Sequence, residues 1–547
     1  MKKRFISIIC IVAVLFAFFA ASCSTKDNDS KNTDTQATGQ EKTTSTNENT
    51  GDTKNTEKGY TLPIVTEPTT LRYGTIENYY SPKSYTLNLP SWQEIEKKTG
   101  VKIEWDVTPS AQYATVMSTR LAAGTDLPDI IMVPGDPMTY IPSGIFAPLS
   151  DMIDQYAPNI KKMLDEDKRL RKIFTAPDGK IYTLSVPTSA QDTIQPYGYL
   201  VREDWMKKLS INEPTTINEW YDMLKAFKEK DPNGNNEKDE TPFTCQNVSA
   251  LLRFGNSWGL SLAAGGFHED NDGKVQFGYM LPEAKELLTW LNKLFQEGLI
   301  DPDFPAMNTD QFHTRVTSNQ AGATINFLNQ IDSYTKPMVS KVPDAKWTMV
   351  VPPKGPIGHA HMERYGPISR YYAVMSNSKK QELAVKWLDY TYGSDEGNTY
   401  QTFGVEGLTY NVVDGKKVFT DYVLKNPDGL GAIDVIRSVG AWPGTLYRQT
   451  EDYFLAFNGS EFQSLAQKVL PYQIDKIPAM LSTEDETQVM KEVWTDINTY
   501  VNEMALKYIL GQESLDKYDQ FVETLKSMGI DEVIKVKQAQ LDRYNKN

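Results

Sequence analysis

The sequence predicts an α/β fold with at least two lobes, and three observations lead to this prediction. The chain of 547 residues is longer than one hydrophobic core usually organises. Hydrophobic residues make up 40% of it, which is enough to fill two cores. From residue 61 onward, runs typical of strands alternate with helical periodicity, which is the pattern of a parallel sheet whose strands are joined by helices.

A βαβαβ unit opens this region. Such units form parallel strands with right-handed connections, so we expect one sheet here. The predicted elements are a strand at 70–75, a helix through Trp92 and Ile95, a strand at 101–107, a helix that has Tyr113, Val116, Met117 and Leu121 on one face and stops at Gly124, and a strand at 127–133.

Aromatic and acidic residues follow two of these strands. Tyr79 and Tyr80 come after the first strand, and Gly135 and Asp136 come after the third. In open α/β sheets the ligand crevice lies beyond the carboxyl ends of the strands. Tyr79, Tyr80 and Asp136 are therefore candidate ligand contacts, although a turn or local packing explains each of them equally well.

The first 22 residues, 1–22, have the features of a signal peptide. Three basic residues at 2–4 precede an apolar run at 5–21, which is too short and wrongly flanked for an ordinary membrane span. The run ends in Ala20-Ala21-Ser22-Cys23, which resembles a lipobox with alanine in place of the usual leucine. We expect Cys23 to carry lipid and to become the first residue; the alternative is an ordinary cleavage site beside a bystander cysteine.

Residues 23–60 are predicted to be the lipidated cysteine and a disordered tether. The polar composition of 24–59 cannot bury enough surface to fold, although it also suits a cleavage-prone tail. A flexible chain of this length reaches on the order of 30 Å, which would hold the folded part on the outer face of the cytoplasmic membrane. Cys10 leaves with the signal peptide, so Cys245 has no partner thiol apart from the lipidated one and we expect no disulfide.

The charge of the chain excludes one class of partner. The formal net charge is -14 and no long run of Lys and Arg occurs, whereas binding to nucleic acid needs a basic face. Aromatic residues make up 11% of the chain, which leaves side chains that can stack on a flat ligand.

Several short motifs occur in order along almost the whole mature chain. They are Leu127-Pro-Asp-Ile-Ile, Asp178-Gly-Lys-Ile-Tyr, Val201-Arg-Glu-Asp-Trp-Met-Lys-Lys-Leu, Pro214-Thr-Thr-Ile-Asn-Glu-Trp, Glu297-Gly-Leu-Ile-Asp-Pro, Gly404-Val-Glu-Gly-Leu-Thr-Tyr and Gln538-Ala-Gln-Leu-Asp-Arg-Tyr-Asn. Together they resemble the motifs of the extracellular solute-binding proteins of ABC carbohydrate importers, and the resemblance is strongest to the large lipoproteins that include the alginate-oligosaccharide binders.

The resemblance implies a periplasmic-binding-protein-like fold, in which two α/β lobes joined by a hinge close on a ligand in the cleft between them. We place lobe one at 61–187 plus 345–395 and lobe two at 188–344 plus 396–547. The implied function is to capture an oligosaccharide and deliver it to the permease subunits of an ABC importer. We expect a monomer that attaches to the membrane through its lipid alone and that catalyses no reaction.

One helix of the second lobe is predicted from the residues themselves. Thr216 and Glu219 have the spacing of a capping box. Trp220, Leu224 and Phe227 fall on one face of the following helix, so we assign them to the core.

An enzyme is the competing class, but its motifs are incomplete. Gly255-Asn-Ser-Trp-Gly259 matches the nucleophile elbow of serine hydrolases, yet the paired glycines that follow disfavour the helix an elbow needs. Asp301 and Asp303 could suggest a glycosidase, but their Asp-Pro-Asp-Phe-Pro sequence is typical of a turn. His359 and His361 could bind a metal, but no third ligand is evident, and a solvated loop explains them better.

Sugars favour aromatic faces and side chains that hydrogen-bond hydroxyl groups. Trp258 and Trp442 are candidate stacking residues, and for each a packing role is equally compatible with the sequence. Arg370 and Arg437 are candidate counter-charges for an acidic ligand, so neutral and acidic oligosaccharides both remain open. A receptor for a peptide or another small solute on the same scaffold is the alternative.

The run 231–240 predicts a structural Ca²⁺ site, because side chains at alternate loop positions can supply the hard oxygens that Ca²⁺ requires. Pro242 stands where an EF-hand loop has its bidentate glutamate, and Asn236 stands where such a loop has glycine. In place of the missing glutamate Glu240 could close the shell, as the resemblance to the alginate binders implies; a solvated turn is the alternative. The predicted ligands are Asp231, Asn233, Asn235, the carbonyl group of Glu237, Asp239 and Glu240.

Overall fold

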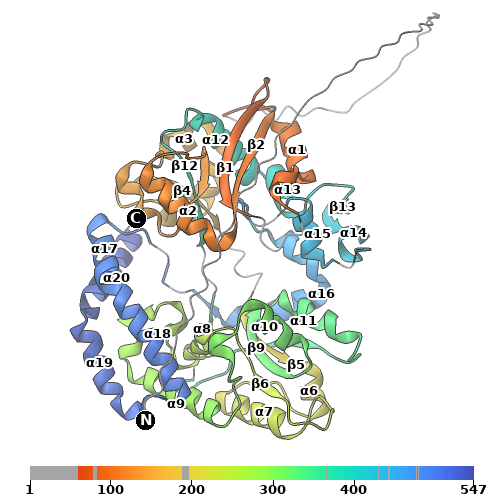
Figure 1. Ribbon diagram of the computed structural model, residues 1–547, viewed down its shortest axis with the longest axis vertical. Coiled ribbons are helices and arrows are strands. Elements are labelled where there is room, and N and C mark those ends of the chain that lie inside the picture. The colour runs from red at the N-terminus through yellow and green to blue at the C-terminus, as the bar shows by residue number, and fades with distance from the viewer. Residues whose placement is uncertain are drawn as a thin grey trace, which may run out of the picture. The chain divides into compact units, whose positions relative to one another are not determined.

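The structure is a computed structural model of the chain (Figure 1). It describes residues 59–77, 83–187, 196–358, 360–364, 368–428, 430–441, 444–475, 477–478 and 480–546. The predicted signal peptide, Cys23 and all of the tether up to residue 58 lie outside these residues.

The first sheet confirms the predicted βαβαβ unit. Its five strands lie in the order β2-β1-β3-β12-β4, and β1 pairs in parallel with both β2 and β3. The fourth strand in this order, β12, runs antiparallel to both of its neighbours, so the sheet is mixed. The bounds are β1 (Thr69–Ile76), β2 (Val101–Thr108), β3 (Ile130–Met132), β4 (Thr183–Pro187) and β12 (Ile368–Val374).

A second sheet has four strands in the order β10-β5-β9-β6. Here β5 is antiparallel to both of its neighbours, and β6 is parallel to β9. The bounds are β5 (Tyr197–Arg202), β6 (Thr241–Phe243), β9 (Ala321–Phe327) and β10 (Trp347–Val350). The chain between β10 and β12 therefore leaves the second sheet and returns to the first. The lobe boundaries stay a prediction, although residues 347–350, which we placed in lobe one, pair within the second sheet.

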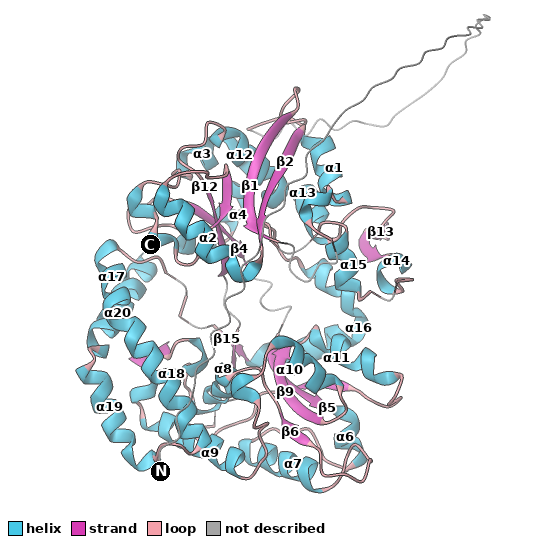
Figure 2. Ribbon diagram, viewed as in Figure 1, coloured by secondary structure: helices cyan, strands magenta, loops and turns pink. Residues whose placement is uncertain are grey.

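Helices lie against both sheets, as Figure 2 shows. Around the first sheet are α1 (Pro90–Thr99), α2 (Ser110–Ala123), α3 (Ser150–Tyr156), α4 (Pro158–Glu166), α5 (Lys168–Phe174), α12 (Gln381–Leu388) and α13 (Asp395–Thr402). Against the second are α6 (Glu203–Lys208), α7 (Ile217–Glu229), α10 (Thr309–Thr317), α11 (Gln330–Val339) and α16 (Glu451–Val469).

The remaining helices and strands form smaller groups. The helices are α8 (Val248–Leu252), α9 (Pro282–Gln296), α14 (Asp421–Leu424), α15 (Ala432–Ser438), α17 (Glu484–Val489), α18 (Thr495–Leu510), α19 (Tyr518–Ser527) and α20 (Ile530–Lys546). Three two-stranded pairs are formed by β7 (Phe267–Glu269) with β8 (Val275–Phe277), β11 (Met362–Glu363) with β15 (Gln473–Ile474), and β13 (Tyr410–Val413) with β14 (Lys416–Phe419). No helix of the described residues combines the length and the apolar character that crossing a membrane requires.

Helices α7 and α2 can be compared directly with the capping box and the helical face that the sequence predicts. The capping box at the start of α7 is confirmed, because Thr216 accepts from the amide of Glu219 and Glu219 accepts from that of Thr216. In α2, Tyr113, Met117 and Leu121 are buried, but Val116 is 37% exposed, so its predicted place on the buried face is wrong. The buried residues follow an interval of four, and Val116 lies beside that line rather than on it.

A chain segment far along the sequence completes the core of the first sheet. Leu446 and Tyr447 are buried with its strands and helices, and the amide of Leu446 donates to the hydroxyl group of Tyr73 at 3.3 Å. Tyr85 stacks on Trp105 with ring centroids 4.7 Å apart. The C-terminal part of the chain thus stabilises the N-terminal sheet directly.

Candidate functional site

All five strands of the first sheet have one end at the same edge. The parallel strands β1, β2 and β3 end there, β4 ends there because it pairs antiparallel with β12, and β12 begins there. This is the edge at which α/β sheets bind ligands. We call it the ligand edge.

Three of the predicted contacts, Tyr79, Tyr80 and Trp442, lie outside the described residues. The described residues beside them come together at the ligand edge. Thr75, near the end of β1, donates a hydrogen bond to the carbonyl group of Gly444. Gly444 lies close to Tyr85, because a Cβ atom added to Gly444 would be 3.0 Å from the hydroxyl oxygen of Tyr85. Described residues that flank Tyr79, Tyr80 and Trp442 in the sequence are therefore in contact with one another.

Asp136 lies at the ligand edge and is exposed. Its carboxylate accepts from the amide of Met138 at 2.9 Å and so caps the short helix Pro137–Thr139. Burial raises the pKa of Tyr371, on β12, and the charge of Asp136 raises it further. Burial lowers the pKa of Lys537, and the negative charge of Asp136 opposes this shift. One carboxylate at this edge thus acts on two groups from distant parts of the chain.

Arg370 lies near the start of β12 at the same edge and is half-buried. Burial raises the pKa values of Tyr85 and Tyr372, and the positive charge of Arg370 opposes both shifts. Tyr85 and Tyr372 are buried, so of these three side chains only that of Arg370 is partly exposed. Arg437, the other candidate counter-charge, lies 3.3 Å from Asp434 on α15.

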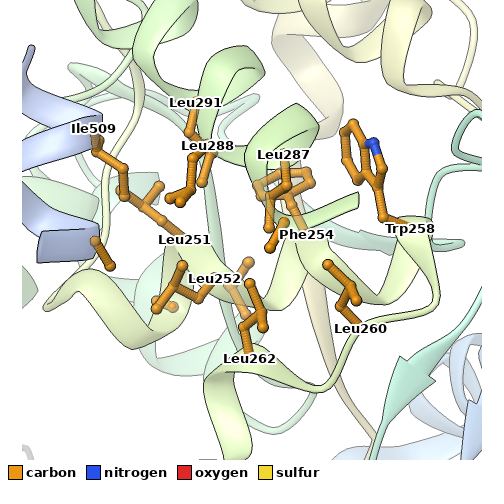
Figure 3. Close-up of a cluster of buried hydrophobic side chains, with 14 of the residues drawn as sticks. Leu251, Leu252, Phe254, Trp258, Leu260, Leu262, Leu287, Leu288, Leu291 and Ile509 are labelled. Atoms are coloured by element: carbon orange, nitrogen blue, oxygen red, sulfur yellow. The ribbon is translucent and has the colours of Figure 1, made fainter. Parts of the chain in front are cut away.

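Trp258 is 3% exposed and lies in the core beside the second sheet. Its ring centroid is 5.8 Å from that of Trp290 on α9, and Figure 3 shows it beside Leu287 and Phe254. The indole nitrogen of Trp258 has no hydrogen-bond partner. The packing is that of a core residue, and contact between Trp258 and a ligand stays a prediction.

The residues that suggested an enzyme have structural partners. The hydroxyl group of Ser257 is fully buried and donates to the carbonyl group of Pro353 at 2.7 Å, within a 3-10 helix rather than a strand-to-helix turn. Asp301 and Asp303 both interact with Arg315, at 3.4 Å and 2.8 Å. Both carboxylates therefore share one cationic partner within the fold. His359 lies outside the described residues.

The 231–240 loop folds around the carboxylate of Asp231. The amides of Gly234 and Asn235 donate to Asp231 Oδ1 at 2.9 and 3.1 Å, and the amide of Asn236 donates to Oδ2 at 3.1 Å. Asn236 has a φ of 62°, as predicted for the residue that replaces glycine. The first predicted ligand thus organises the loop backbone.

The other predicted ligand side chains turn toward the same region. The amide nitrogens of Asn233 and Asn235 donate to Asp239 Oδ1 at 2.9 and 3.0 Å. Oε1 of Glu240 is buried without a hydrogen-bond partner. Burial raises the pKa of Glu240, and the charges of Asp231 and Asp239 raise it further.

This donor set suits a hard cation, because three carboxylates and two amide oxygens come from one short loop and one buried oxygen lacks a donor. Within the described ranges, however, no three His, Cys, Asp or Glu side chains are already arranged to hold a metal. The asparagines would have to turn their oxygens inward to bind one.

Two polar features near the second sheet were missed from the sequence. The guanidinium group of Arg253 lies 4.4 Å from the ring centroid of Tyr197, and Arg253 also donates to the carbonyl group of Glu363 at 3.4 Å. Glu363 is 1% exposed, and neither oxygen of its carboxylate has a hydrogen-bond partner. Neither residue lies in a motif, so only their surroundings in the fold reveal them.

Comparison with known proteins adds the family. The sequence model of the family described as bacterial extracellular solute-binding protein matches residues 81–397. The fructooligosaccharide ABC transporter substrate-binding protein FusA of Streptococcus pneumoniae serotype 4 (strain ATCC BAA-334 / TIGR4) is 26% identical over 535 residues, which cover 90% of this chain and 93% of FusA. The polygalacturonan/rhamnogalacturonan-binding protein YtcQ of Bacillus subtilis (strain 168) is 24% identical over 81% of this chain and 86% of YtcQ.

A solved structure is similar over nearly the whole fold. The alginate-binding protein AlgQ2, in a crystal structure without calcium ion, matches with a TM-score of 0.75 and 27% identity, over 87% of this chain and 99% of AlgQ2. The expected periplasmic-binding-protein-like fold with two α/β lobes is thereby confirmed.

Proposed function

Because this chain belongs to the family of bacterial extracellular solute-binding proteins, we propose that it captures an oligosaccharide and delivers it to the permease of an ABC importer. The observation that carries this proposal is the similarity to FusA, a fructooligosaccharide-binding protein, over 90% of the chain. A match of this extent includes both sheets and the segments between them. Binding without catalysis is the activity of such proteins.

The ligand edge supports an oligosaccharide as the solute. Sugar hydroxyl groups both donate and accept hydrogen bonds, and their apolar ring faces stack on aromatic side chains. Asp136, which is exposed, and Arg370, which is half-buried, supply an acceptor and a donor at this edge. Tyr79, Tyr80, Trp258 and Trp442 are proposed as further ligand contacts.

The two sheets are proposed to form two lobes that close on the sugar. The chain passes from the second sheet back to the first after β10, and we propose the described part of this passage, 351–358 and 360–364, as a hinge. Closure of two lobes around a ligand is a common motion of such folds.

We propose that the 231–240 loop binds one structural Ca²⁺ ion. Its six predicted ligands are Asp231, Asn233, Asn235, the carbonyl group of Glu237, Asp239 and Glu240. A cation here would give the buried oxygen of Glu240 a partner and reduce the repulsion among the carboxylates. The ion would stabilise the exit of α7 and would take no part in holding the sugar.

Attachment to the outer face of the membrane through a lipid on Cys23 is proposed from the sequence. The same arrangement would let the tether present the folded part to the permease, since a chain of this length spans on the order of 30 Å.

A glycan panel tests the main proposal. Because a ligand that binds only the folded state raises its melting temperature, we expect one class of oligosaccharide to raise it in a concentration-dependent way and to be recovered unchanged. Calorimetric titration of the responding glycan should give one binding site. If peptides raise the melting temperature and no glycan does, the alternative of a peptide receptor replaces this proposal.

A further inference from the structure

The second sheet has an edge of the same kind as the ligand edge. The parallel strands β6 and β9 end there, β10 ends there because it pairs antiparallel with β5, and β5 begins there. β5 is also the next described strand after β4, which ends at the ligand edge. Because ligands of α/β sheets bind beyond the carboxyl ends of parallel strands, residues at this second edge are placed to contact a solute.

Two aromatic side chains stand at the second edge. Tyr197, the first residue of β5, pairs with Phe327, the last residue of β9. Their ring centroids are 4.9 Å apart with the ring planes at 81°, and both residues are half-buried. A half-buried aromatic ring at such an edge leaves apolar surface on which the face of a sugar ring can stack.

Buried polar groups fix Tyr197 in place. The guanidinium group of Arg253 lies 4.4 Å from the centroid of the Tyr197 ring, and Arg253 is 7% exposed. The side-chain amide of Gln473 donates to the carbonyl group of Tyr197 at 3.4 Å. A cation over an aromatic ring is attracted to it, so the exposed part of the ring has a defined orientation before any ligand arrives.

The carboxylate of Glu363 belongs to the same group of residues. Glu363 is the last residue of β11; its carbonyl group accepts from Arg253 at 3.4 Å, and its amide donates to Oδ1 of Asn256 at 3.1 Å. The residue is 1% exposed, yet among the described residues neither carboxylate oxygen has a hydrogen-bond partner. The cation that follows it, Arg364, pairs with Asp475 at 2.8 Å. The backbone of Glu363 is thus fixed while its carboxylate lacks donors, which is costly for a buried charge unless another molecule supplies them.

We propose that Tyr197 and Glu363 form a sugar subsite at the second edge, in which one sugar ring stacks on Tyr197 and a hydroxyl group of that sugar donates to the carboxylate of Glu363. This inference rests on the proposed function and adds residues of the second sheet to its site. Arg253 contacts both residues, so a single sugar unit can reach both. Since no hydrogen bond from a described residue holds the carboxylate, it can turn toward the sugar without breaking one. Sugars suit this pair because they combine an apolar ring face with hydroxyl donors.

The test titrates four sugars by calorimetry into the full mature chain and its variants. Kestose, maltotriose, mannotriose and trigalacturonate are the probes, and the melting temperature of each ligand-free form is measured as well. Tyr197→Ala removes the ring and Tyr197→Phe keeps it, whereas Glu363→Gln removes only the charge of the carboxylate. The matched controls are Tyr422→Ala, at a residue of α14 that is 36% exposed, and Glu297→Gln, at a half-buried residue whose carboxylate accepts from Tyr221 at 2.8 Å.

We expect the probe that binds the wild-type chain to bind about tenfold more weakly to Tyr197→Ala, and to keep its affinity within about twofold in Tyr197→Phe, which retains the ring. Glu363→Gln should weaken the same probe about fivefold to tenfold, because a charged acceptor makes the stronger hydrogen bond. It should also raise the melting temperature of the ligand-free chain by about 1 °C or more, because a buried charge without donors is removed. The controls should leave the affinity unchanged, and Glu297→Gln should not raise the melting temperature.

Other results contradict the inference in distinguishable ways. Unchanged affinity in both Tyr197→Ala and Glu363→Gln removes the subsite and leaves the proposed function intact, and a loss in one of them alone overturns the role of the other residue. A lower melting temperature of ligand-free Glu363→Gln shows that the carboxylate has a structural partner and overturns its role in binding. If Tyr197→Phe loses as much affinity as Tyr197→Ala, the hydroxyl group binds rather than the ring, which overturns the stacking. No binding of any probe by the wild-type chain counts against the oligosaccharide function itself.

Discussion

The hydroxyl group of Tyr60 donates a hydrogen bond of 3.1 Å to Asp389, which lies 329 residues further along the chain. Asp389 is fully buried and also accepts from Asn159 at 2.8 Å and from the amide of Ile160 at 2.7 Å. The first residues of the folded part are thereby fixed to α4 and to the end of α12. This contact is where the predicted tether gives way to fixed structure.

Asp389 should make the stability depend on pH. Burial raises its pKa from 3.8 to about 6, so the folded state binds a proton more readily than the unfolded state. The resulting stabilisation is fully present below pH 3.8 and is lost as the pH rises to about 6, a change of about 3 kcal/mol. Urea unfolding of wild type and Asp389→Asn between pH 4 and 7 should show a difference in free energy that varies over this window. Asp421→Asn, at an exposed site, should show none.

The carboxylate of Glu240 should destabilise the metal-free protein and should be required for tight Ca²⁺ binding. Its buried oxygen has no donor and its neighbours are Asp231 and Asp239, so Glu240→Gln should stabilise the metal-free protein by about 1 kcal/mol. The same variant should weaken Ca²⁺ binding, measured by titration after chelation. Glu237→Gln is the control, because only its carbonyl group is a predicted ligand. Equal Ca²⁺ affinity in wild type and Glu240→Gln would remove Glu240 from the site.

Trp258 should contribute strongly to stability. It is 3% exposed and lies beside Leu287, Phe254 and Trp290, and truncation of such a side chain to alanine costs about 3–5 kcal/mol. Trp258→Phe should cost less because most of the volume remains. Val413 is 52% exposed, so Val413→Ala should change the unfolding free energy by less than about 0.5 kcal/mol. A small loss in Trp258→Ala would contradict the core assignment.

Ser257 should affect stability and have no catalytic role. Its hydroxyl group satisfies the carbonyl group of Pro353, so Ser257→Ala should cost about 1 kcal/mol. Incubation of the wild-type chain with the bound glycan should yield no product by chromatography. Product that disappears in Ser257→Ala would establish a hydrolase instead.

Cys23 should determine where the mature protein is found. Cys23→Ser removes the thiol that receives lipid, so the protein should move from the membrane fraction to the medium or the soluble extracellular fraction. Mass spectrometry of the wild-type protein should find an acylated N-terminal cysteine. An unmodified start at another residue would contradict the lipobox interpretation.

Local patterns predicted the parts of the fold that depend on neighbours in the sequence. The parallel strands β1, β2 and β3 and the capping box at Thr216 follow from periodicity and spacing, so they were found. The place of Leu446 in the core of the first sheet depends on a contact with Tyr73, more than 300 positions earlier, and no local pattern reports such a contact.

The candidate site was predicted less completely for the same reason. Asp136 was placed at the ligand edge because it follows a strand of the predicted βαβαβ unit, and its contact with a ligand stays a prediction. Trp258 was ambiguous because its burial is decided by α9, which no motif connects to it.

The position of β12 in the middle of the first sheet limits the order in which the chain can fold. β12 lies between β3 and β4 in the sheet, but its last residue is Val374. The last strand of the second sheet, β10, already ends at Val350. During synthesis and export, β3 and β4 emerge long before the strand that joins them, and their exposed edges can pair wrongly in the meantime. All strands of the second sheet emerge before β12 does, so the second sheet can fold as a unit inserted within the first sheet. A partner that holds the N-terminal part open until residue 374 has crossed the membrane would therefore raise the yield of folded protein.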